Sequence, residues 1–263
     1  MDLSIVVVSH NQQALVKKYL PSLFTVIASV TFEVLLIDNT CSDGTADWVS
    51  KNLPQVQIIR NNVPKSYAEN MNMGMKRMLN GRYFVVCNPD IEILTGLWGE
   101  AVKFMDNNHD VGIMGPQLLN PDYTIQSSCR RFSTPLNLLI RGLHLDGLLK
   151  SFGPVHNYLM LDYDHKSVID VDWVTGALMF VRRQAITKVG GMDELYKMAY
   201  SEDQDWCCRM WRGGWRVCYV PQAKAIHDHQ RTGMRKPWSK MARVQLINAV
   251  RMFQKFNWKL SRS

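Results

Sequence analysis

The sequence has no apolar run long enough to cross a bilayer, which would need about 20 consecutive apolar residues. Its first residues, MDLSIVVVSHNQQ, contain an acid at position 2, a short apolar run and no cleavage site of small residues. These features exclude a typical secretory signal, so we expect this stretch to form a first β-strand.

Cysteine patterns typical of disulfide frameworks or metal sites are also missing. The six cysteines contain no CxxC pair, and several lie in predicted strands or helices, where free cysteine behaves as a small apolar side chain. They are Cys41, Cys87, Cys129, Cys207, Cys208 and Cys218. A chain of this kind favours a reducing compartment, and we expect the cytoplasm.

Positive charge is in excess. Lys and Arg number 31 against 23 Asp and Glu, so the net charge is +8 and an anionic partner is expected. Nucleic acid, an acidic membrane surface and phosphorylated ligands all fit this charge. The 263 residues are 46% hydrophobic, without an obvious repeat or linker, which favours one composite domain over residues 1–263.

Four apolar runs predict β-strands in the first half, with segments of helical spacing between them. Because these runs do not alternate with polar residues, we expect strands buried on both faces of a mostly parallel sheet flanked by helices, an α/β fold. The four runs are 3–8, 33–37, 56–60 and 83–87.

The second half gives weaker signals. Residues 113–165 are predicted to be an irregular excursion, and 168–183 a strand, a turn at Gly176 and a second apolar run. Residues 201–215 have the pattern of a helix with acids in its first turn, ended by two glycines. A strand over 216–220, stopped by Pro221, and a loop over 223–233 are expected to follow.

Polar residues stand where the predicted strands end, namely Asn11, Asp38, Asn88 and Asp90. Ligands of such sheets gather at the carboxyl ends of the strands, so the row predicts a binding crevice. In Asn88-Pro89-Asp90, proline fixes the backbone, and Asp90 can serve as an oxygen ligand of Mg²⁺ or Mn²⁺. The tripeptide is equally consistent with a simple turn, and Asp38 with either a nucleoside contact or no function.

Two further clusters carry chemistry. The stretch SEDQDWCCR has three carboxylates within four positions, where crowding raises the pKa of a general base, although a solvated helix start explains them too. On a helix, Glu202 and Asp205 share a face and Asp203 points elsewhere. His227 and His229 alternate along an extended segment; one of them can complete a metal site with Asp90, which would favour Mn²⁺, or both can be surface residues.

Taken together, the motifs resemble glycosyltransferase family 2, and they are most similar to its bacterial rhamnosyltransferase-like branch. The resemblance covers roughly residues 3–230, in the family's order. It is carried by VVVSHN, LLIDNTCSDGT, YAENMNMG, CNPDIEI, VDWVTGALMFVRR, GGMDE, SEDQDWCCR, GGW and IHDH.

The resemblance implies a GT-A fold and an inverting, metal-dependent hexosyl transfer from a nucleoside-diphosphate sugar, with Mn²⁺ or Mg²⁺ as cofactor. L-Rhamnose from dTDP-rhamnose is the leading donor, while UDP-galactose, galactofuranose and N-acetylglucosamine donors remain open. The implied acceptor is a glycan or a polyprenyl-linked glycan of a bacterial surface polysaccharide such as O-antigen. About 1–110 would form the nucleotide-binding half and about 111–233 the acceptor and catalytic half.

Site residues also follow from the resemblance. Asp203 matches the catalytic base, and Glu202 beside it helps to place the acceptor. Asp90 matches the metal-binding acid of the family's Asp-X-Asp motif, where Asn88 departs from the strict pattern, and His227 matches a histidine that ligates the metal in some members. The implied nucleotide-sugar contacts are Ser9, Asn11, Asp38, Asn72, Asn88, Asp90, Trp173 and Gly176.

The C-terminal residues 238–263, taken as one helix, place cations on one arc and apolar side chains on the other. Such a helix can lie on anionic lipid, giving a peripheral association with the inner membrane face, or it can pack its apolar arc on the core. The cations are Lys240, Arg243, Arg251, Lys255, Lys259 and Arg262, and the apolar residues are Leu246, Ala249, Val250, Phe253, Phe256 and Leu260.

Two other function classes rank lower. A nucleotidyltransferase would be expected to have a glycine-rich, basic loop near the first strand, and SHNQQALVKK contains no glycine. A nucleic-acid-binding module would interleave its charge along a groove-reading motif, whereas the positive charge here is concentrated toward the C-terminus. We therefore expect no nucleic acid partner.

Overall fold

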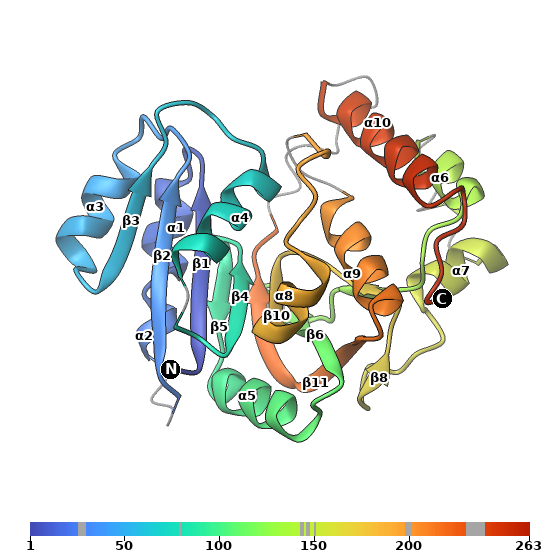
Figure 1. Cartoon of the computed structure of the whole chain (residues 1–263), viewed down its shortest axis with the longest axis horizontal. Coiled ribbons are helices and arrows are strands. Elements are labelled where there is room, and N and C mark those ends of the chain that lie inside the picture. The colour runs from blue at the N-terminus through green and yellow to red at the C-terminus, as the bar shows by residue number, and fades with distance from the viewer. Residues whose placement is uncertain are drawn as a thin grey trace.

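A computed structural model describes residues 1–25, 30–78, 80–142, 145, 148–149, 151–197, 201–229 and 240–263 (Figure 1). The strands are β1 (Leu3–Ser9), β2 (Phe32–Asp38), β3 (Val56–Arg60), β4 (Tyr83–Cys87), β5 (Ile91–Ile93), β6 (Val111–Leu119), β7 (Cys129–Arg130), β8 (Ile169–Asp170), β9 (Trp173–Val174), β10 (Leu178–Arg182) and β11 (Arg216–His227). The helices are α1 (Gln13–Tyr19), α2 (Ser22–Thr25), α3 (Thr45–Asn52), α4 (Tyr67–Arg77), α5 (Leu97–Asn107), α6 (Pro135–Gly142), α7 (Gly153–Leu159), α8 (Arg183–Val189), α9 (Glu202–Arg212) and α10 (Lys240–Lys255).

A mixed central sheet runs through the molecule in the order β3-β2-β1-β4-β10-β6-β11-β5, and β8 pairs with β11 at its edge (Figure 1). The first four strands are parallel, which confirms the α/β fold predicted for this half. β10 then runs antiparallel to both β4 and β6. The expected mostly parallel arrangement therefore holds for the first half of the sheet, whereas the second half is mixed, because β6 and β11 are parallel and β10 and β5 run antiparallel to their neighbours.

Apolar side chains cover both faces of the sheet, as the unbroken hydrophobic runs predict. Along β1, Val6 and Val8 belong to one core, and Ile5 and Val7 to the other, because successive side chains of a strand point to opposite faces. The first core also contains residues of α4, α9 and α10, and the second contains residues of α1, α3 and α5. The sheet is thus a middle layer between helices.

β5 determines where the end of β4 lies. Only residues 88–90 separate β5 from β4, yet β5 pairs with β11 and lies four places from β4 in the sheet order. A link this short spans at most about 14 Å, so the sheet has to curl back on itself. In the β5–β11 ladder His227 is opposite Ile91, and the Asp228 N–H donates to the Asp90 carbonyl at 3.0 Å. This pairing brings the end of β4 to the end of β11.

Two predictions for the second half are wrong. Residues 113–165 are not merely irregular, because β6 is a fully buried strand in the middle of the sheet. β11 does not stop at Pro221 but continues to His227, so residues 223–227 of the predicted loop are strand. Residues 230–233 lie outside the described part. The helix predicted over 201–215 is confirmed as α9, which ends at Arg212.

The last helix packs on the core. α10 ends at Lys255, short of the predicted 263, and residues 238–239 lie outside the described chain. Of the predicted apolar arc, Ala249, Phe253 and Phe256 are buried, whereas Leu246 is 50% exposed, so most of the arc packs on the protein. No helix in the described ranges is long and apolar enough to cross a bilayer.

Cations of the C-terminal segment pair with acids of the core. Lys255 Nζ lies 2.6 Å from Asp193 Oδ2 and from Asp205 Oδ2, and Arg262 Nε lies 2.7 Å from Asp172 Oδ1. Asp205 is fully buried on α9 and also accepts from Arg209. The Lys255–Asp205 pair attaches the segment to α9, the helix that carries the predicted catalytic acid.

Replacing Lys255 with methionine should lower the free energy of unfolding by about 2 kcal/mol, because Asp205 would remain buried with one cation fewer. Urea denaturation measures the change. Lys259→Met, on the exposed end of the same segment, is the matched control and should change stability by no more than about 0.5 kcal/mol. Equal effects of the two variants would contradict the role given to this ion pair.

Candidate active site

A cavity of about 670 Å³ opens beyond the carboxyl ends of β1 and β4, where the sequence predicts a crevice. Seven of the predicted site residues line it together, although they come from positions far apart in the chain. They are Asn88, Asp90, Trp173, Gly176, Glu202, Asp203 and His227. The β4–β10 and β5–β11 ladders account for most of this convergence.

Asp90 and His227 form one side of the cavity. His227 Nε2 lies 3.4 Å from Asp90 Oδ1. Both residues are buried, with His227 7% and Asp90 6% exposed. Neither of these two atoms has a hydrogen-bond partner. Buried polar atoms are almost always partnered, so this pair requires an explanation.

A divalent cation bound between the two side chains would satisfy both atoms. An imidazole nitrogen and a carboxylate oxygen are suitable ligands, and together they suit Mn²⁺ better than Mg²⁺, which prefers oxygen alone. Among the described residues, no group of three or more His, Cys, Asp or Glu side chains could hold a metal ion. The protein would therefore supply two ligands, and a bound phosphate and water the others.

The acid pair at the start of α9 forms the other side. The N–H of Gly176 donates to Asp203 Oδ2 at 3.1 Å, and the N–H of Gln204 donates to Oδ1 at 2.8 Å. Burial raises the pKa of Asp203 above its usual value, although these hydrogen bonds and the charge of Arg130 act in the opposite direction. A carboxylate with a raised pKa that faces a cavity is suited to accept a proton.

Gly176 allows a close approach to this acid, because a Cβ at this position would lie 3.4 Å from the Asp203 Cβ. Helical spacing predicts that Glu202 and Asp205 share a face and that Asp203 points elsewhere. This prediction is wrong for the cavity, which Glu202 and Asp203 both line. Asp205 instead points into the core, where it bonds Arg209 and Lys255.

Tyr67, to which the sequence analysis assigns no role, connects the two sides. Its hydroxyl lies 3.0 Å from Asn88 Oδ1 and 3.1 Å from the Gly176 carbonyl oxygen. Burial raises the pKa of Tyr67 well above its usual value, and the nearby Glu202 charge adds to the shift. The phenol therefore stays protonated and can donate. Its helix, α4, begins with a capping box between Ser66 and Glu69.

The sequence contains two pairs of adjacent arginines, Arg130-Arg131 and Arg182-Arg183. Of these four residues, only Arg130 lines the cavity. Its guanidinium lies over the Trp173 ring at 5.3 Å and beside Tyr158 at 5.6 Å. Arg182 bonds the main-chain oxygens of Val111, Met105 and Asn108, and Arg183 bonds those of Gly81 and Met78. That second pair holds the sheet to its helices.

Four predicted contacts do not line the cavity. Asp38 Oδ1 accepts from the Cys41 N–H, and Asn11 Oδ1 accepts from the Ser42 N–H, so both stabilise the loop after β2. Ser9 is fully buried. Asn72 bonds both the N–H and the carbonyl oxygen of Met192, which gives it a structural role on this geometry. The neighbouring residues His10, Gln12, Asn39 and Asn70 line the cavity in their place.

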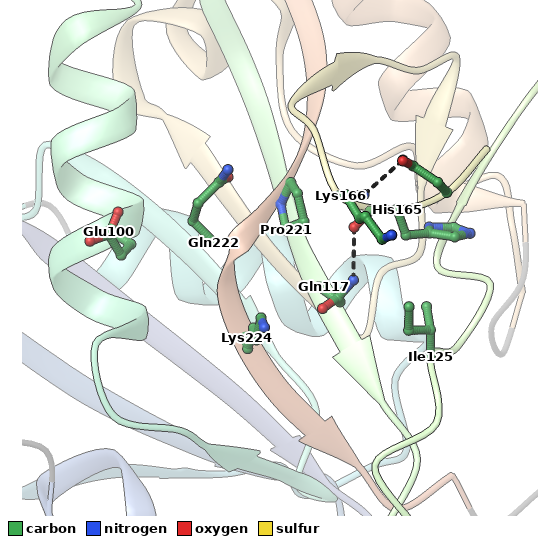
Figure 2. Close-up of a pocket in the computed structure, with 9 residues that line it drawn as sticks. Glu100, Gln117, Ile125, His165, Lys166, Pro221, Gln222 and Lys224 are labelled. Atoms are coloured by element: carbon green, nitrogen blue, oxygen red, sulfur yellow. Dashed lines mark hydrogen bonds between the residues drawn. The ribbon is translucent and has the colours of Figure 1, made fainter.

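A second cavity, of about 540 Å³, lies beside the irregular part of β11 (Figure 2). At its wall, Gln117 donates to the His165 carbonyl at 3.1 Å. Glu100 of α5 and Lys224 of β11 also line it. It contains neither Asp90 nor the acid pair. The predicted catalytic and metal-binding residues therefore gather at the first cavity.

Two family profiles match nearly the whole chain. The profile described as Glycosyl transferase family 2 matches residues 4–158, and that of Glycosyl transferase family group 2 matches 157–260. N-acetylglucosaminyl-diphospho-decaprenol L-rhamnosyltransferase of Mycobacterium tuberculosis (strain ATCC 25618 / H37Rv) is 27% identical over 253 residues, which are 91% of this chain and 80% of the relative. Rhamnosyltransferase WbbL of Escherichia coli (strain K12) is 46% identical over 57 residues, which are 22% of this chain and 21% of WbbL.

Solved structures share the fold at low identity. GalNAc-T7 with UDP, GalNAc and Mn²⁺ has a TM-score of 0.73 at 14% identity, covering 98% of this chain and 49% of GalNAc-T7. Mannosyltransferase PcManGT from Pyrobaculum calidifontis, with GDP-Man and Mn²⁺, has a TM-score of 0.60 at 13% identity, covering 98% and 76%. The chain thus spans about half the length of GalNAc-T7. The protein thus has a GT-A fold, and the family profile over more than half its length shows that it belongs to glycosyltransferase family 2, where it is rhamnosyltransferase-like.

Proposed function

We propose that the protein is an inverting, metal-dependent glycosyltransferase that moves L-rhamnose from dTDP-rhamnose to a hydroxyl of a lipid-linked glycan. The observation that carries the proposal is the division of one cavity into two sides. The Asp90–His227 pair, with its unpartnered atoms, lies on one side, and Asp203, with its raised pKa, lies on the other.

The division suits a single displacement. The acceptor hydroxyl loses its proton to Asp203 while its oxygen forms a bond to the anomeric carbon, and the bond from that carbon to the diphosphate oxygen breaks. Attack from the side opposite the leaving group inverts the carbon, so one base is sufficient. Glu202, beside Asp203, is placed to hold the acceptor.

Asp90 and His227 would hold the divalent cation, for which their unpartnered atoms are suited. When bound, the cation supplies positive charge to the departing diphosphate. Arg130 and Lys65 line the same cavity and add positive charge for phosphate oxygens. Asn88, next to the cation site, is fixed by Tyr67.

The choice of donor and acceptor rests on the mycobacterial relative, whose name specifies an L-rhamnosyl donor group and an N-acetylglucosaminyl-diphospho-decaprenol acceptor. A UDP-sugar is the alternative donor, since TarS 1-349 of S. aureus shares the fold in a complex with UDP-GlcNAc. The six free cysteines fit work in a reducing compartment, which we propose to be the cytoplasm.

A thermal-shift panel of dTDP, UDP, GDP and their sugars, with and without Mn²⁺, tests this function. Stabilisation by ligand follows RT ln(1 + [L]/Kd), so a bound nucleotide at 100 times its Kd adds about 2.7 kcal/mol. We expect the largest shift with dTDP-rhamnose and Mn²⁺ together. A larger shift with a UDP-sugar would replace the donor, and no Mn²⁺-dependent shift with any nucleotide would contradict the proposal.

Replacing Tyr67 with phenylalanine should lower kcat about 10-fold, because a lost hydrogen bond of about 1.4 kcal/mol loosens both Asn88 and the Gly176 turn that holds Asp203. Steady-state kinetics measure the change. Tyr163→Phe is the matched control, since the Tyr163 hydroxyl bonds the Ser167 carbonyl away from the cavity. An unchanged kcat in Tyr67→Phe would show that the connection has no catalytic role.

A further inference from the structure

Gln126, which follows β6, lines the cavity and holds the end of β11. Its main-chain N–H donates to the Leu118 carbonyl at 2.8 Å. Its side-chain Nε2 donates to the His227 carbonyl at 2.6 Å and to Asn120 Oδ1 at 2.8 Å. Both hydrogens of the amide are therefore used on oxygen acceptors.

This arrangement determines which way the amide points. If the side chain were flipped, its oxygen would face two other oxygens, so the Nε2 and Oε1 positions follow from the hydrogen-bond network. Oε1 then lies 2.9 Å from His227 Nδ1. An amide oxygen can only accept, so Nδ1 carries the proton. In the neutral ring, the lone pair is left on Nε2.

The lone pair faces Asp90. Nε2 and Asp90 Oδ1 are 3.4 Å apart, and both are buried without a hydrogen-bond partner. Two electron-rich atoms at this distance repel each other unless a cation lies between them. The second ring nitrogen of a metal-binding histidine usually donates to an oxygen acceptor, which fixes the tautomer and the ring orientation. Gln126 Oε1 is that acceptor here.

We propose that Gln126 is a positioning residue that holds His227 in the tautomer and orientation needed to bind the divalent cation with Asp90. This inference rests on the proposed metal-dependent function and adds a residue that acts on the cation site through His227. A purely structural role would also fasten β11, but it would not require a particular tautomer. The two roles therefore predict different measurements.

Metal affinity is the first measurement. Electron paramagnetic resonance of free Mn²⁺ follows the binding of Mn²⁺ alone and of Mn²⁺ together with UDP or dTDP. Gln126→Met, close in size but without the acceptor, should weaken Mn²⁺ binding 10- to 100-fold. Gln126→Glu keeps an acceptor for Nδ1–H and should recover part of the affinity. Gln222→Met, at an exposed position of β11, is the matched control.

The tautomer is the second measurement, made without metal on protein labelled with ¹⁵N-histidine at a pH where the ring is neutral. The His227 signals are those lost in His227→Asn. Wild type and Gln126→Glu should show the Nδ1-protonated form, and Gln126→Met a shift toward the Nε2-protonated form. An unchanged tautomer and unchanged Mn²⁺ affinity in Gln126→Met would overturn the role given to Gln126 and leave the proposed metal-dependent function standing. A wild type that binds no Mn²⁺ would overturn the metal-dependent function as well.

Discussion

Replacing Asp203 with asparagine is expected to lower the rate of sugar transfer about 10³-fold while the protein stays folded. Positioned general bases contribute roughly 10²- to 10⁴-fold, and the amide of asparagine cannot take the acceptor's proton. Asparagine retains an oxygen for the Gly176 N–H, so the turn at this end of the cavity should stay in place. Radiolabelled transfer at saturating donor measures the effect.

The pH dependence provides a second reading of the same variant. Because burial raises the Asp203 pKa, the wild-type rate should fall with decreasing pH at a higher pH than an exposed aspartate, whose pKa is about 3.9, would cause. The variant's residual rate should lack this fall. The same shift makes stability fall as the pH rises, whereas the rate falls as the pH drops. Because the folded-state pKa of Asp203 is raised, its contribution to stability is fully present below the unfolded-state pKa and is lost as the pH rises through the folded-state pKa. Removing the charge should therefore leave the neutral-pH Tm unchanged or higher.

Glu100→Gln is the matched control, since it removes one carboxylate from the second cavity (Figure 2). It should transfer sugar at the wild-type rate with the wild-type pH profile. If Asp203→Asn retained the full rate, the base would have to be sought in the neighbouring Glu202, which lines the same cavity.

Local sequence predicts the first half of the fold well. Unbroken apolar runs followed by Asn or Asp are sufficient to place β1, β2, β3 and β4, each within one residue at either end. For β1, β2 and β4 they are sufficient because these strands are largely buried, so the pattern depends on the strand alone and not on its partners. β3 lies at the edge of the sheet and is partly exposed, and Val56, Ile58 and Ile59 mark it.

β6 could not be predicted in the same way, because its sequence, VGIMGPQLL, contains two glycines and a proline. Gly115 is explained by packing: a Cβ there would lie 2.7 Å from the Val174 side chain, so only glycine allows β9 to approach. Pro221 in β11 is tolerated because the register shifts between Val220 and Lys224. Both features depend on tertiary neighbours that a local pattern does not reveal.

The site residues differ in the same way, since some are indicated by local sequence and others only by tertiary contacts. Asp90 follows β4 and Asp203 lies in the first turn of α9, so the local sequence pattern indicates both. His227 lies in the segment predicted to be a loop, and its alternation with His229 and the family resemblance indicate it. Tyr67 and Gln126 act through contacts with residues about 100 positions away, namely Gly176 and His227. The only local signal was the capping box that begins α4 at Tyr67, and it predicts a helix start without a function.

Replacing Asp90 with asparagine is expected to abolish the Mn²⁺-dependent part of nucleotide binding and to lower transfer about 10³-fold, or about 4 kcal/mol in the activation barrier. The variant keeps the size of the side chain but removes the charge that, with His227, faces the proposed cation. Its fold should be retained, because the carboxylate is buried with an unpartnered oxygen and gains no stability from its charge. Thermal shifts with dTDP or UDP, with and without Mn²⁺, measure the binding.

Asp203→Asn and Asp90→Asn together separate the two sides of the cavity. The first should keep the Mn²⁺-dependent thermal shift and lose transfer, whereas the second should lose both. Glu92→Gln, two residues from Asp90 on β5 and outside the cavity lining, is the control for removing an acid from this strand and should lose neither. If Asp90→Asn kept a wild-type Mn²⁺-dependent shift, the cation would bind elsewhere, and the charge that stabilises the departing diphosphate would have to come from Arg130 and Lys65 alone.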